Sequence, residues 1–159
     1  MADLTPLDEK LAEVLGLAQA AQDTSAQVAG MEDAEDFREQ LEGMGKDATE
    51  TERRTDAHVD TLEGRKTAIR DMAKETKAEV AEMREAYLEG EEEALDGFEF
   101  LTMSEAGELG HWEIVQTMAK AVGDQSVGEL AEWAVGVQRR HFDGVRASAL
   151  KLAEAEARG

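Results

Sequence analysis

The chain has 159 residues, which is enough for one domain with a hydrophobic core, and it carries a net charge of −20 at pH 7. It contains no cysteine, which excludes disulfides and thiolate metal sites, and no apolar run approaches the roughly 20 residues of a membrane-spanning helix. The negative charge repels nucleic-acid phosphates and anionic membranes, so we expect neither as a partner.

Helix-forming residues dominate the chain, proline occurs once, and valine and isoleucine do not alternate as they do in strands. We therefore predict an all-α fold with residues 1–159 in a single domain. The first ten residues, MADLTPLDEK, lack the basic and apolar regions of a signal peptide, so we expect a cytoplasmic protein.

The first predicted helix begins at Thr5 and Pro6, where a capping hydroxyl precedes a proline and Asp8 lies in the first turn. Its apolar residues recur at helical spacing to about Val28, and we expect it to end near Gly30.

A second helix is predicted from Asp33, as its cap, to about Leu62, and helical periodicity resumes over 66–88. One unbroken helix of about 55 residues would extend for about 80 Å, which is long for a compact domain. We therefore expect a break or kink near Gly64, and the pattern leaves open whether segment 66–88 continues the second helix or turns back.

A further helix is predicted over 93–122, ended by Gly123, and the last helix is expected to open with a capping box from Ser126 to Glu129. The turn between these two helices is very short, so they must be antiparallel neighbours. The whole pattern predicts an up-down four-helix bundle with an extra helical segment at 66–88.

Two carboxylates interrupt the apolar stripe of helix 93–122. Glu105 and Glu108 lie between Leu101 and Trp112, and a carboxylate on a buried face needs a cation, a proton or an ion pair. One hypothesis pairs Glu105 with Arg139 or Arg140.

The other hypothesis is a metal site, because glutamate and histidine from facing helices bind iron, manganese or zinc inside bundles. His58 and His141 fall on or beside the apolar faces of their helices, and His111 lies at the flank of the stripe, three residues after Glu108. The last helix has Gln138 where a second Glu-x-x-His motif would need its glutamate. We predict that one or two ions bind to Glu105 and Glu108, with imidazole from His58 or His141.

Three stretches resemble the ferritin-like superfamily, nearest its YciF-type branch of bacterial stress proteins: DEKLAEVLGLAQAAQDTS at 8–25, GRKTAIRDM at 64–72 and ALDGFEFLTMSEAGELGHWEIVQTMAKAVGD at 94–124. The resemblance implies a bundle that dimerises and has a dinuclear metal site. It makes Glu9, Glu105 and Glu108 ligands. It leaves the ligand of the second helix open among Glu50, Glu52 and His58, and leaves His141 as the ligand of the last helix.

The predicted function is therefore metal binding in metal, oxidative or salt stress, with at most a ferroxidase-like or peroxidase-like activity. The alternative is a non-catalytic acidic helical protein that acts through dimerisation or partner binding, with salt bridges among its polar core residues. The dispersed acidic residues and only seven lysines favour adaptation to a salt-rich cytoplasm over mimicry of a nucleic acid.

Overall fold

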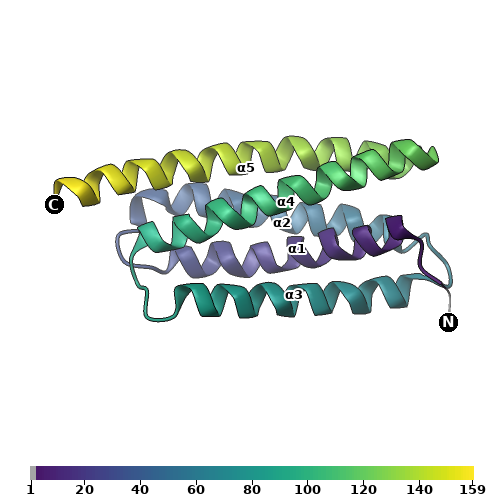
Figure 1. The fold of residues 1–159 in the computed structure, drawn as a ribbon, viewed down its shortest axis with the longest axis horizontal. Coiled ribbons are helices and arrows are strands. Elements are labelled where there is room, and N and C mark those ends of the chain that lie inside the picture. The colour runs from purple at the N-terminus through teal and green to yellow at the C-terminus, as the bar shows by residue number, and fades with distance from the viewer. Residues whose placement is uncertain (1–2) are drawn as a thin grey trace.

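The structure is a computed structural model that describes residues 3–159. Helices form nearly all of this range, which confirms the all-α prediction (Figure 1). The elements in chain order are α1 (Pro6–Ala29), the short 3₁₀ turn η1 (Glu35–Phe37), α2 (Arg38–Val59), α3 (Lys66–Leu88), α4 (Ala94–Val122) and α5 (Gln125–Arg158).

Each long helix runs antiparallel to the one before it (Figure 1). The most extensive packing joins α4 to α5, and α1 packs against α2, α3 and α4. Smaller contacts join α2 to α5 and α3 to α4, so α3 lies mainly on α1. Within residues 3–159, no helix is both long enough and apolar enough to cross a membrane.

The chain reverses direction between α2 and α3, whereas the sequence predicted only a break or kink near Gly64. Helix α2 ends at Val59, and Gly64 has a φ of +82°, a left-handed conformation that glycine adopts without steric cost. This turn excludes one continuous helix through residues 33–88.

The helix caps agree with the sequence prediction at α1 and differ from it at α2 and α5. Thr5 and Asp8 form a capping box, with each side chain accepting a hydrogen bond from the backbone N–H of the other residue, at 3.1 and 2.9 Å. Asp33 does not cap α2, because η1 intervenes. Asp124 rather than Ser126 caps α5, because its carboxylate accepts the N–H of Val127 at 3.0 Å.

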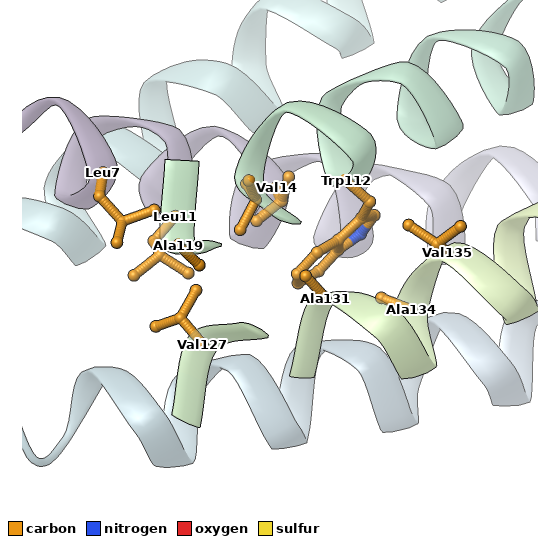
Figure 2. Close-up of a cluster of buried hydrophobic side chains, with 10 residues drawn as sticks. Leu7, Leu11, Val14, Trp112, Ala119, Val127, Ala131, Ala134 and Val135 are labelled. Carbon is orange, nitrogen blue, oxygen red and sulfur yellow. The ribbon is translucent and has the colours of Figure 1, made fainter. Parts of the chain in front are cut away.

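Two apolar clusters occupy opposite ends of the packed helices. One cluster includes Trp112 of α4, surrounded by small and branched side chains of α1, α4 and α5 (Figure 2). The other cluster joins the start of α4 to α1, α2 and α5 through Val28, Leu41, Met44, Phe98, Leu101 and Val145. The segment of α4 between Leu101 and Trp112 therefore crosses the middle of the molecule.

Candidate functional site

A polar layer lies between the two apolar clusters. Helix α4 contributes Glu105 and Glu108, and α5 contributes Gln138 and His141. Their exposed fractions are 2%, 5%, 3% and 8%. Both pairs are spaced by three residues, which puts each pair on one face of its helix, and the packing of α4 against α5 brings the two faces together.

One amide group bridges the two carboxylates. Nε2 of Gln138 donates hydrogen bonds to Oε2 of Glu105 at 2.8 Å and to Oε2 of Glu108 at 3.1 Å. Neither Oε1 atom accepts a hydrogen bond from any residue in the range 3–159. The bridge supplies donors but no positive charge, so it does not neutralise the pair.

His141 connects the pair to α2. Its Nδ1 lies 3.6 Å from Oε2 of Glu105, and its Nε2 lies 2.8 Å from Oδ2 of Asp47. Burial lowers the pKa of His141, but the carboxylates of Glu105 and Asp47 outweigh that effect, so its pKa lies above 6.5. A protonated His141 therefore offsets part of the buried negative charge.

Glu108 is buried beside a second carboxylate, which changes its pKa. Burial, and then repulsion from Glu105, raise its pKa well above 4.5. Two carboxylates that share one amide donor cannot both ionise at low cost, so Glu108 retains a proton at pH values at which exposed glutamates have lost theirs.

The layer is accessible from the surface beside α2. The side chain of Asp47 is 44% exposed. It lines, together with His141 and Arg140, a surface groove of about 210 Å³ between α2 and α5. Solvent and ions can therefore reach the outer side of His141.

The structure brings together three of the predicted site residues, separates Glu9 and His58 from them, and places His111 in the wall of a cavity that Glu105 and Glu108 also line. Glu105, Glu108 and His141 are adjacent. Glu9 is exposed on α1, and His58 lines a separate cavity beside Asp8 and Arg65. His111 is 39% exposed, with Nδ1 2.7 Å from the carbonyl of Gly107 and Nε2 3.3 Å from Glu13.

The remaining candidates for the second helix face other partners. Glu50 pairs with Arg53 and Arg54, and their hydrogen bonds lower its pKa to about 2. Glu52 accepts a hydrogen bond from Gln22 at 2.9 Å.

The hypothesis of an arginine partner for Glu105 is wrong. Arg139 pairs with Glu113 at 3.2 Å on the surface, and Arg140 donates to the carbonyl of Gly136 at 3.4 Å. Both arginines are exposed on α5, whereas Gln138 and His141 face the core. The partners of Glu105 are therefore an amide and an imidazole.

Sequence reasoning missed the roles of Asp47 and Gln138. Asp47 lies three residues after the buried Met44 and four before the buried Thr51, so its place at the edge of the inner face of α2 could have been read from the periodicity. The sequence prediction treats Gln138 only as the residue that stands in place of the glutamate of a second Glu-x-x-His motif. A buried glutamine opposite two buried glutamates is the signal that would have identified the bridge.

As they stand, the described residues contain no group of three or more histidine, aspartate or glutamate side chains arranged to hold a metal ion. No protein-family model, no curated protein and no solved structure matches the chain.

Proposed function

We propose that the protein binds one divalent transition-metal ion, iron, manganese or zinc, through Glu105, Glu108 and His141. The observation that supports this most is the pair of buried carboxylates joined by a neutral amide. Burying two carboxylates without a cation is costly. A divalent ion would balance both charges at once.

The donor atoms suit such an ion. Carboxylate oxygen and imidazole nitrogen are common ligands of iron, manganese and zinc. The contact of Nε2 of His141 with Asp47 fits the arrangement in which a carboxylate orients a metal-binding histidine and leaves the other nitrogen for the ion. Two atoms bound to one ion at about 2.1 Å lie at most about 4.2 Å apart, and Nδ1 of His141 lies 3.6 Å from Glu105.

The arrangement supports one ion better than two. Glu9 and His58 lie apart from the pair. His111 lines a cavity that the pair also lines, but its ring nitrogens face the carbonyl of Gly107 and Glu13. Binding requires the amide of Gln138 to move away from the Oε2 atoms that it bridges. The groove beside Asp47 supplies the entry route.

The wider proposal is a ferritin-like bundle of α1, α2, α4 and α5, with α3 as an additional helix, which forms a homodimer in the cytoplasm and acts in metal, oxidative or salt stress. The antiparallel order of the helices supports the bundle, and the turn at Gly64 favours it over a long interaction helix. Iron bound in the polar layer would supply Fe(II)/Fe(III) redox chemistry.

One observation favours the alternative, an acidic helical protein that acts by association. A protonated His141 and a protonated Glu108 would leave the layer neutral without any ion, because both pKa values are raised. The polar layer would then be a structural network of hydrogen bonds and an ion pair.

The test is the metal content of protein loaded with Fe(II) under anaerobic conditions, with Mn(II) or with Zn(II), and then freed of excess metal. We expect about one ion per chain, and loss of that ion in Glu105→Gln, Glu108→Gln and His141→Gln. Glu113→Gln is the matched control, because Glu113 lies on the surface of the same helix. Equal metal content in the wild type and all four variants would refute the proposal.

A further inference from the structure

A second feature reaches the carboxylate pair from the side opposite α5. A cavity of about 420 Å³ lies among α1, α3 and α4, and no residue of α5 lines it. Its walls are mainly apolar side chains, among them Leu17, Val80, Met83, Phe100 and Met103. Cavities of this size with apolar walls and a few polar groups are typical of sites for small organic molecules.

The mouth of the cavity exposes apolar surface. Met83 of α3 is 58% exposed, and Met103 of α4 is 52% exposed. Methionine is flexible and polarisable, and it adapts to ligands of varied shape. Because α3 packs mainly on α1 and has few contacts with α4, the side chains of Met83 and Met103 remain exposed beside the cavity.

The cavity wall also has polar side chains, those of Thr24, Tyr87, Ser104 and His111, besides the two buried carboxylates of Glu105 and Glu108. Gln138 occupies their Oε2 atoms, while both Oε1 atoms lack a donor among the described residues. An apolar cavity thus meets two carboxyl oxygens to which no described residue donates a hydrogen bond.

We propose that this cavity binds a small apolar molecule that carries a protonated amine, with the ammonium group against Glu105 and Glu108 and the apolar body along α3. An ammonium group supplies three donors and a positive charge. A carboxylate ligand would be repelled by ionised Glu105, and an alcohol would supply one donor and no positive charge. The proposal is independent of metal binding, although an ion on the pair would weaken amine binding by neutralising it.

The experiment compares 1-octylamine, 1-octanol and octanoate on metal-free full-length protein by isothermal titration calorimetry. We expect octylamine to bind about tenfold or more tighter than octanol, since hydrogen bonds to charged groups are the stronger ones, and octanoate to bind weakest. Equal affinity for octylamine and octanol would overturn the assignment of an amine, and no binding of octylamine would overturn the site.

Two glycines of α4 provide a matched pair of variants. Gly107 lines the cavity, and Gly110 does not. A Cβ atom at either position meets nothing within 4 Å, so neither substitution forces the backbone to move. Gly107 is exposed at the edge of the cavity, so Gly107→Leu should obstruct the cavity and weaken octylamine binding, whereas Gly110→Leu should leave the affinity for octylamine unchanged. Equal binding by both variants would show that the amine binds to the acidic surface, and would refute the site.

Methionine methyl NMR gives a readout that does not depend on any variant. Octylamine should shift the methyl resonances of Met83 and Met103 and leave that of Met44, which lies in a separate apolar cluster, in place. Shifts at Met44 without shifts at Met83 and Met103 would contradict the proposed location. Because this test uses metal-free protein, its result stands whether or not the chain binds a metal ion.

Discussion

Helix α4 passes through two buried regions that contrast in chemistry. Around Trp112, Val115 and Ala119, every neighbour in the cluster is apolar (Figure 2). One to two turns earlier, Glu105 and Glu108 are just as deeply buried, and face Gln138 and His141. Helix α4 therefore contributes both to an apolar region that stabilises the fold and to a polar region that lowers its stability.

The comparison indicates where function lies. A buried apolar cluster is what the hydrophobic effect produces unaided. A buried polar layer could be replaced by apolar side chains with little loss and often with a gain in stability. Its presence between two apolar clusters is thus the main reason to look for a ligand there.

The largest effect is expected in the apolar region. Trp112→Ala should lower the free energy of unfolding by about 3–5 kcal/mol, because it removes a fully buried indole and leaves a cavity. Nε1 of Trp112 has no hydrogen-bond partner, so Trp112→Phe should cost much less. Urea denaturation followed by circular dichroism measures both. A loss below about 1 kcal/mol for the alanine variant would contradict the role assigned to this region.

A smaller loss is expected when the bridge of the polar layer is removed. Gln138→Leu should lower the free energy of unfolding of the metal-free protein by about 1–3 kcal/mol, because two buried acceptors lose their donor. The control is the same substitution in a Glu105→Leu, Glu108→Leu background, where no acceptor remains. We expect almost no loss there, and an equal loss in both backgrounds would show that the amide bridge contributes nothing.

The positions of the helices could be predicted from the sequence because the apolar periodicity that indicates a helix is a local pattern. Apolar periodicity predicted the segments 66–88 and 93–122, and the structure has Lys66–Leu88 and Ala94–Val122. The two caps predicted wrongly lie near the actual helix starts: α2 begins at Arg38, after η1, and Asp124 caps α5 two residues before Ser126. The choice between such neighbours depends on how the loop packs, which the local pattern does not contain.

The candidate site could be predicted only in part, for a related reason. The stripe on α4 predicts that Glu105 and Glu108 are buried, because burial depends on the face of one helix. Which residues of other helices stand opposite depends on how the helices are shifted along one another. That shift brings Asp47 to His141, and it leaves His58 beside Asp8 at another cavity.

The pH dependence separates the two regions further. Glu108 keeps its proton in the folded protein after it would ionise in the unfolded chain, so the free energy of unfolding falls as the pH rises above 4.5 towards its raised pKa. His141 acts in the same direction, because the stability gained from its raised pKa is present below 6.5 and is lost as the pH rises through that pKa.

Glu108→Gln should therefore flatten the fall in stability of the metal-free protein between about pH 5 and 8. Denaturant unfolding at several pH values measures the slope, with Glu113→Gln as the surface control. A slope identical to that of the wild type in Glu108→Gln would show that Glu108 ionises normally in the folded protein.

The smallest effect is expected from salt, and it tests the surface against both buried regions. With a net charge of −20 the surface repels itself, and molar KCl shortens the screening length to about 3 Å. The melting temperature should rise as KCl increases towards the molar range, which is the result that the predicted adaptation to a salt-rich cytoplasm requires. The rise should be the same in the wild type, Trp112→Phe and Glu108→Gln, because mobile ions screen buried groups little. A flat or falling melting temperature would contradict the adaptation, and a rise confined to proteins with Glu108 would place the relevant repulsion in the polar layer instead.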